Sequence, residues 1–345
     1  MKLSLEEDES LLAERAAALL RVPAGEIREV RILRRAVDAR EGVHLVYTLH
    51  VGVKHEAQVL RRCRNKKVSR AEERSYRLPE PVPTPAVPPV VVGAGPGGLF
   101  CALALARCGA RPILLERGWN VERRQADVER FWSTGALDTE SNVQFGEGGA
   151  GAFSDGKLNT GTRDPRHRFI LETLVSHGAP ESILVDAKPH VGTDYLHRTL
   201  ISLRRELEDL GCDVRFGHRL AGLEVREGHV TALEVAGPDG LYRLPAQQVV
   251  LALGNSARDT FQMLHAAGVP MEPKPLAVGV RIEHRQRDID LTQYKELAGH
   301  PRLGPPATSS AATWTAAGGC SASASAPGGR WWPPPARRSG PSPTA

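Results

Sequence analysis

Hydrophobic and polar residues alternate along the first part of the chain in a way that predicts a small α+β module. The clearest strand signal is an uninterrupted alternation whose apolar members are Val43, Leu45, Tyr47, Leu49, Val51 and Val53. Val30–Val37 predicts a partner strand, and Glu41-Gly42 between the two suggests a hairpin turn. Leucines and alanines between Glu7 and Leu20 predict a helix that Pro23 and Gly25 stop.

A second pattern begins at Val90, where a short apolar strand runs into a glycine-rich turn. The residues Val90–Arg117 read VVVGAGPGGLFCALALARCGARPILLER. Val90–Val92 predicts a buried strand, Leu99–Ala106 an apolar helix, and Ile113–Leu115 a second buried strand. This strand–turn–helix–strand order is typical of a parallel α/β sheet.

The remaining pattern extends this sheet and adds a meander. Leucines spaced along 193–210 predict a helix, with Thr193 as its N-cap and Gly211 just past its end. Further predicted helices cover 121–131 and 261–267, and 249–254 (VVLALG) predicts a buried strand beside the first one. Short apolar runs at 213–216, 220–225, 230–235 and 242–244 predict more strands, with a turn at 238–240.

The turn after Val92 carries the spacing G-x-G-x-x-G at Gly93, Gly95 and Gly98. The first glycine permits a sharp turn, the second lets a pyrophosphate approach the backbone, and the third lets the helix pack closely on the sheet. The helix N-terminus then offers N–H groups to phosphates. Glu116 ends the second strand, where an acid accepts hydrogen bonds from an adenosine ribose and disfavours NADP. The alternative interpretation is a strand–helix turn without a ligand.

A second glycine-rich run covers 145–157 and reads FGEGGAGAFSDGK. So many glycines make neither a good helix nor a good strand. The functional interpretation is a cofactor loop whose backbone N–H groups converge on a ligand, with Lys157 able to stabilise electron density on a reduced flavin. The alternative is a flexible surface loop.

Composition narrows the class of protein. The chain has 345 residues, 41% of them apolar, and a modest net charge of +5. Its five cysteines form no C-x-x-C pair, so the sequence predicts neither a zinc site nor a redox dithiol, and no other metal site. The acidic start MKLSLEEDES is no signal peptide, and prolines interrupt the uncharged stretch 81–106, so we expect a cytoplasmic protein without a membrane segment.

Basic residues gather between Lys54 and Arg74. A nucleic-acid-binding face is one interpretation. No aromatic residues for base stacking are interleaved, so a solvated basic helix and loop is the favoured one. The six prolines of 79–89 predict a stiff linker after this module.

The last segment, 304–345, has a composition unlike the rest of the chain. It contains no acidic residue and no Leu, Ile, Val or Phe, so it cannot bury a core and is predicted to be disordered. The residue types present all have GC-rich codons. We therefore hypothesise that the segment is read out of frame, a natural low-complexity tail being the alternative.

With these motifs in hand, the chain resembles bacterial FAD-dependent dehydrogenases of unassigned substrate. The resemblance covers about 1–303 and rests on GAGPGGLFCALALARCGARPILLERG (93–118), FGEGGAGAFSDGKLNTGT (145–162) and VVLALGNSARDTF (249–261). It implies a non-covalent FAD. The residues that it places at the cofactor are Gly93, Ala94, Gly95, Pro96, Gly97, Gly98, Glu116, Arg117, Gly149, Ser154, Lys157, Leu220 and Gly254.

The resemblance also implies a division of the chain. We expect an α+β module at 1–78, a linker at 79–89, an FAD-binding Rossmann-type α/β domain with an inserted substrate region at 90–303, and the tail. The late Gly-Asp element that completes such domains is missing after Gly304. Retention of FAD by this chain is therefore in doubt.

The function expected from this resemblance is that of an FAD-dependent oxidoreductase. It would transfer hydride from a small organic substrate or from NAD(P)H, and the sequence singles out no catalytic acid or base. An NAD-dependent dehydrogenase and a nucleic-acid-binding protein are the alternatives. The first leaves the run 145–157 unexplained, and the second rests on the basic region 54–74.

Overall fold

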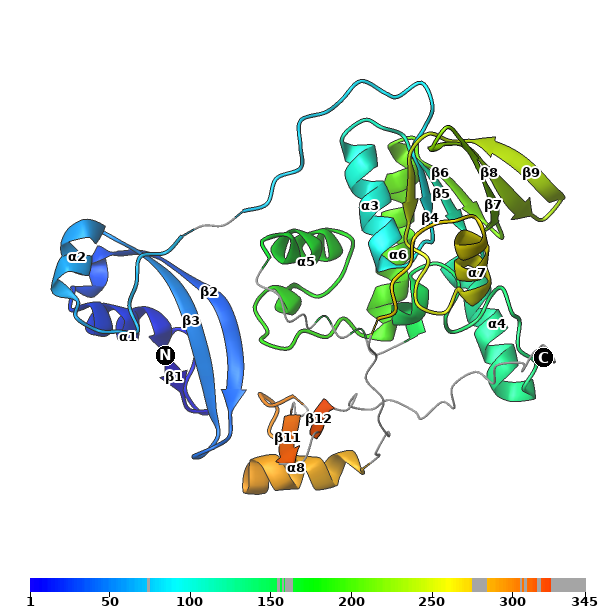
Figure 1. Cartoon of the computed structure of the whole chain (residues 1–345). Helices are drawn as coiled ribbons and strands as arrows, with labels where there is room; N and C mark the ends of the chain where they lie inside the picture. The colour runs from blue at the N-terminus through cyan, green and yellow to red at the C-terminus, as the bar shows by residue number, and fades with distance from the viewer. Residues whose placement is uncertain are drawn as a thin grey trace.

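The computed structural model describes residues 1–72, 75–153, 156, 158, 164–274, 284–304, 306, 309–314 and 318–323. Two bodies are visible in Figure 1, an N-terminal lobe in blue and a larger α/β body in cyan to yellow. The segment between them contains the prolines of 79–89.

The N-terminal lobe is a three-stranded antiparallel sheet backed by helices. Its elements are β1 (Lys2–Leu3), α1 (Leu11–Leu20), a 3-10 turn (Ala24–Glu26), β2 (Ile27–Asp38), β3 (His44–Val53) and α2 (Glu56–Arg62), with strand order β1-β3-β2. The predicted hairpin is β2–β3, and its register pairs Val37 with Leu45. The helix α1 begins later than predicted because the Glu7 carboxylate accepts the Ser4 N–H in the preceding turn.

The larger body is built on a four-stranded parallel sheet in the order β10-β4-β5-β6. Its strands are β4 (Val90–Val92), β5 (Ile113–Glu116), β6 (Asp213–Phe216) and β10 (Val249–Leu251). As predicted, the strand formed by the VVLALG run pairs with the first strand, Val249 opposite Val90. The prediction that this strand is buried was wrong: Val250 and Leu251 are 38% and 41% exposed, because β10 is the edge of the sheet in the described part of the chain.

Helices and a meander complete this body. The helices are α3 (Pro96–Arg107), α4 (Val121–Thr134), α5 (Arg166–Ser176), α6 (Thr193–Asp209) and α7 (Arg258–Ala266), and the antiparallel meander is β7 (Arg219–Arg226), β8 (His229–Gly237) and β9 (Gly240–Pro245). One core lies between the sheet, α3 and α6, where Leu103, Leu114 and Leu203 are buried. The N-cap of α6 is Gly192 rather than the predicted Thr193, because the helix already includes Thr193 and Gly192 adopts a positive φ of 82°. Gly211 follows the helix as predicted, with φ +83°.

Shorter elements complete the described chain. They are the 3-10 helices η2 (Gly149–Phe153), η3 (Glu181–Leu184) and η4 (Lys295–Leu297), α8 (Gln286–Tyr294), and a hairpin of β11 (Ser309–Trp314) and β12 (Gly318–Ser323) within the tail predicted to be disordered. No helix among the described residues is both long and apolar enough to cross a membrane.

The N-terminal lobe contacts the α/β body through Arg35. The backbone of Arg35 on β2 donates to Val185 O and accepts from Ala187 N, and its guanidinium pairs with Asp186 at 2.8 Å.

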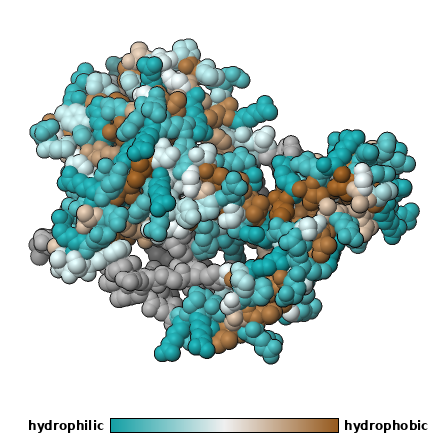
Figure 2. All heavy atoms as spheres, turned by 180° about the vertical axis from the view of Figure 1, so that it is seen from behind, coloured by the Kyte–Doolittle hydropathy of each residue, from teal (hydrophilic) through white to brown (hydrophobic). Residues whose placement is uncertain are grey.

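Figure 2 shows apolar residues over the N-terminal lobe. On β2 of this lobe, Leu33 and Val37 are 43% and 40% exposed.

Candidate functional site

The turn between β4 and α3 has two positions that only glycine can occupy. Gly93 has φ +104°, and a Cβ there would lie 2.3 Å from the carbonyl oxygen of Ala252, just after β10. A Cβ on Gly98 would lie 1.7 Å from the carbonyl oxygen of Gly93. The turn is therefore pressed against both its own helix and the neighbouring strand, which is the close packing that the glycine spacing predicts.

The N-terminus of α3 faces a cavity. Gly95 occupies the N-cap position and has no side chain to cap the helix, and Pro96 follows at the first helical position. Gly95, Pro96 and Gly97 line the cavity. Because the first backbone N–H groups of a helix lack partners within the helix, this end of α3 can bind an anionic group.

The second glycine-rich loop forms the facing wall. Its Gly148 N–H donates to the carbonyl of Ala94 at 2.8 Å, and a Cβ on Gly149 would lie only 3.1 Å from Cα of Gly95. Gly146, Gly148 and Gly149 all have positive φ. Glycines therefore let two loops, distant in sequence, approach each other across the cavity mouth.

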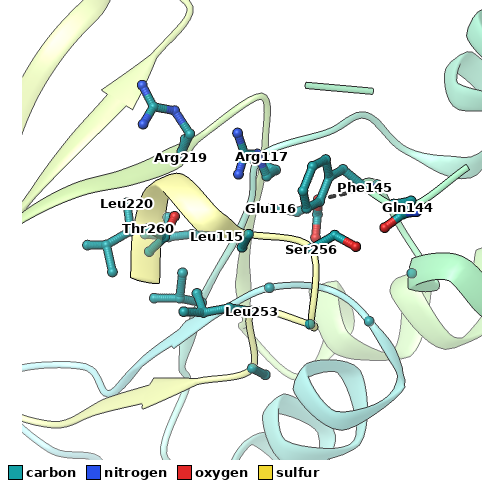
Figure 3. A pocket seen from close by; sticks show the side chains of 18 of the residues that line it. Leu115, Glu116, Arg117, Gln144, Phe145, Arg219, Leu220, Leu253, Ser256 and Thr260 are labelled. Atoms are coloured by element: carbon teal, nitrogen blue, oxygen red, sulfur yellow. Dashed lines mark hydrogen bonds between the residues drawn. The ribbon is translucent and has the colours of Figure 1, made fainter. Parts of the chain in front are cut away.

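The cavity has a volume of about 340 Å³, within the usual range for a small-molecule site. Figure 3 shows its labelled side chains, with Leu115, Leu220 and Leu253 together and Arg117 beside Arg219 at the other end. The cavity is lined by residues of the glycine turn, the second glycine-rich loop, the start of β7 and the segment after β10. It lies at the carboxyl ends of parallel strands, where open α/β sheets bind their ligands.

Most of the predicted cofactor residues line this cavity, and they are Gly93, Gly95, Pro96, Gly97, Glu116, Arg117, Gly149, Leu220 and Gly254. Ala94 and Gly98 are buried in and under the turn, where they set its shape. Ser154 and Lys157 lie outside the described residues. The structure therefore brings together residues from four stretches of sequence, 93–117, 149, 220 and 254, that the resemblance placed at the cofactor.

Glu116 has a larger structural role than the predicted ribose contact. One carboxylate oxygen accepts the N–H groups of Gly118 and Gly146, both at 2.9 Å, and the other accepts the N–H of Ala94 at 2.7 Å. The side chain is 5% exposed. A carboxylate can accept about four hydrogen bonds, so roughly one position remains for a ligand hydroxyl.

Arg117 is occupied by acidic partners. Its guanidinium pairs with Glu140 at 2.9 Å and with Asp259 at 2.9 Å, and it stacks on the Phe145 ring at 4.2 Å from the ring centroid. Arg219 lies 3.5 Å from the same Asp259. Arg117 therefore closes one end of the cavity and is not free to bind a phosphate.

Sequence reasoning missed a buried ionic cluster behind the second glycine-rich loop. Glu147 is fully buried and accepts hydrogen bonds from Val121 N at 2.8 Å and from Arg204 at 3.0 Å. Burial raises the pKa of Glu147 to about 7, and the Arg204 charge opposes that shift. Burial also lowers the pKa of Arg124, beside the same loop, to about 10. The sequence did contain a signal for this cluster, because Glu147 is an acidic residue within a run of glycines.

Other predicted features lie away from this cavity. Cys63, Cys101, Cys108 and Cys212 are free thiols. Among the described residues no cluster of three or more His, Cys, Asp or Glu side chains could hold a metal ion. The basic residues of 54–72 are exposed on and after α2, and Arg74 lies outside the described residues.

The fold and the cavity define a dinucleotide-binding α/β protein. Residues 89–151 match the family model described as "FAD binding domain", so this part of the chain is an FAD-binding domain and its cofactor is FAD. This confirms the predicted Rossmann-type fold class and the predicted cofactor. Residues 1–54 match a model described as "Domain of unknown function (DUF8436)".

The chain is 40% identical over 306 residues to an uncharacterized protein of Clostridium beijerinckii. The match covers 88% of this chain and 57% of that relative, so the chain spans little more than half the length of the relative.

Solved structures are more distant. THI4 of Thermovibrio ammonificans shares 16% identity at a TM-score of 0.36, covering 53% of this chain and 64% of that one. Glycerol-3-phosphate dehydrogenase from Bacillus halodurans complexed with FAD shares 14% at 0.34, covering 51% and 36%. Scores at this level do not bear on the activity of this chain.

Proposed function

We propose that this chain is the FAD-binding part of an oxidoreductase that passes hydride through a non-covalent FAD. The observation that carries the proposal is the cavity, because both glycine-rich loops and Glu116 line it within or beside the FAD-binding domain. The donor would be a small organic substrate or NAD(P)H.

The lining of the cavity suits the pyrophosphate of a dinucleotide. Because Gly93 and Gly98 leave no room for a Cβ and Gly95 and Gly97 line the cavity, a pyrophosphate can rest directly on backbone N–H groups. These glycines and Gly254 would hold the pyrophosphate. The apolar side chain of Leu220 would contact the adenine, and by resemblance Ser154 and Lys157 would approach the flavin.

The charges around the cavity select against a 2′-phosphate. Glu116 has about one free acceptor position, which suits a ribose hydroxyl and repels a phosphate. Arg117 is already paired with Glu140 and Asp259, so it offers no cation in compensation. When bound, FAD supplies the hydride chemistry, and the residues of this chain supply position and electrostatics.

The test is a visible absorption spectrum of the protein after incubation with FAD and desalting. A flavin spectrum that survives desalting supports the proposal. The control is Gly98→Ala, whose Cβ would meet the carbonyl of Gly93, and this variant should be colourless. The same spectrum is then recorded on a chain whose reading frame is restored past residue 303.

If a flavin spectrum appears only in the chain restored past residue 303, the unmodified chain lacks part of the FAD site. If both chains stay colourless although circular dichroism shows that both are folded, the FAD assignment is refuted. NAD retained in place of FAD would favour the alternative of an NAD-dependent dehydrogenase.

A further inference from the structure

The second glycine-rich loop carries an acidic side chain, Glu147, that does not line the cavity. Glu147 is 0% exposed, whereas its neighbours Gly146 and Gly149 line the cavity. Its Oε2 accepts both the Val121 N–H, at the start of α4, and the Arg204 guanidinium of α6. The carboxylate therefore connects the loop to two helices at once.

Arg204 spans the distance from this buried carboxylate to solvent. One guanidinium nitrogen contacts Glu147 at 3.0 Å and the other contacts Glu122 at 2.6 Å. The Glu147 side chain is fully buried, while the Glu122 side chain is 47% exposed. Glu147 and Glu122 thus share one cation but differ strongly in burial, so substitutions of the two can be compared as test and control.

A second arginine holds the same loop through its backbone. Arg124 of α4 is fully buried and donates to the carbonyl oxygens of Asn142 at 2.9 Å and Glu147 at 2.6 Å. On the opposite side, Gly148 N donates to Ala94 O in the glycine turn. The loop is therefore held between the two helices on one side and the glycine turn on the other.

We propose that Glu147, held by Arg204, is a positioning residue that fixes the second glycine-rich loop against the glycine turn and so shapes the cavity for FAD. The cofactor part of this inference rests on the proposed function. No contact between Glu147 and the cofactor is invoked, because its carboxylate faces the helices.

The composition of the loop gives a reason for an ionic contact at this position. Five glycines between 146 and 156 give this segment exceptional backbone freedom, which apolar packing of side chains cannot restrict. A charge-assisted hydrogen bond has a defined direction and distance and so specifies one loop conformation. A buried ion pair contributes little net stability, which makes specificity of conformation the better account of its presence.

The experiment compares the protein as it stands with Glu147→Gln and with the control Glu122→Gln. At pH 8, above the raised pKa of Glu147, both substitutions remove one negative charge from the same arginine, but only the first acts on the loop. Two quantities are measured, the Kd for FAD by flavin fluorescence quenching and amide hydrogen exchange of 142–153 without ligand. Loss of one charge-assisted contact predicts a Kd about tenfold higher for Glu147→Gln and a change within about twofold for Glu122→Gln.

The exchange pattern separates positioning from general destabilisation. We expect Glu147→Gln to speed exchange in 142–153 while α3 and the sheet keep their protection. The double variant Glu147→Gln with Arg204→Met should bind FAD no more weakly than Glu147→Gln alone, since both residues act through one contact. Arg204→Lys, which keeps the charge but loses the planar fork, serves if Glu147→Gln does not fold.

The inference is overturned if Glu147→Gln matches Glu122→Gln in both loop exchange and FAD affinity. It is equally overturned if exchange rises throughout the domain, because the role is then only structural. If neither the unmodified protein nor the chain restored past residue 303 binds FAD, the proposed function fails, and the loop exchange alone still decides whether Glu147 positions the loop.

Discussion

Replacing Glu116 by Gln should destabilise the protein even without any cofactor. The carboxylate accepts three backbone N–H groups, from Ala94, Gly118 and Gly146, and is 5% exposed. An amide has one acceptor oxygen, so its NH2 group must face at least one of these donors. A buried donor left without an acceptor costs about 1–3 kcal/mol, and hydrogen bonds to a charged acceptor lie at the upper end of the range.

The expected loss for Glu116→Gln is therefore about 2–4 kcal/mol in the free energy of unfolding. The assay is urea unfolding of the ligand-free protein followed by circular dichroism, with Glu224→Gln as control. Glu224 pairs with Arg243 on the exposed face of the meander, and we expect no measurable change there.

A Glu116→Gln protein as stable as the unmodified one would refute this reasoning. That result would leave the ribose contact as the role of Glu116, since a residue that only binds the cofactor affects stability only when the cofactor is present.

Three further predictions follow from the site. Gly98→Ala should abolish retention of FAD because its Cβ would lie 1.7 Å from Gly93 O, as absorbance after desalting will measure. Gly97→Ala, with no protein atom within 4 Å of its Cβ, should fold normally by circular dichroism. Burial raises the pKa of Glu147 from 4.5 to about 7, so the native state holds this proton more tightly than the unfolded state does. The free energy of unfolding should therefore decrease by about 3 kcal/mol between pH 4.5 and 7, and this decrease should vanish in Glu147→Gln, as denaturant titrations at several pH values will show. Finally, restoring the reading frame past residue 303 should increase FAD affinity, and an unchanged Kd by fluorescence titration would argue for a natural tail.

Local patterns predicted the elements of the fold well because they depend on neighbouring residues. The alternation of 43–53 became β3, and the apolar run after the glycines became α3. The pairing of 249–251 with β4 followed from its apolar, glycine-terminated strand pattern. The predicted N-cap of α6 was wrong by one position. The Thr193 side chain suggested a cap, but the helix already begins at Thr193 and Gly192 precedes it with a positive φ.

The contacts that shape the site could not be predicted, because their partners are distant in sequence. Arg117 and Asp259 form an ion pair across the fold, and nothing in either segment indicates the other. Glu116 was predicted from its spacing to bind a ribose, but spacing does not show that Gly146 would also donate to it. Likewise, nothing near Glu147 in the sequence indicates that Arg204 would face it.

The open edge of β10 has a consequence for handling this protein. Val250 and Leu251 are well exposed on a strand whose outer backbone groups face no neighbour in the described sheet. An unprotected apolar edge is a template on which another chain can add a strand. We therefore expect a Val250→Lys variant to self-associate less than the unmodified protein at the same concentration, because a charge on this edge disfavours strand addition, and Val250 does not line the cavity.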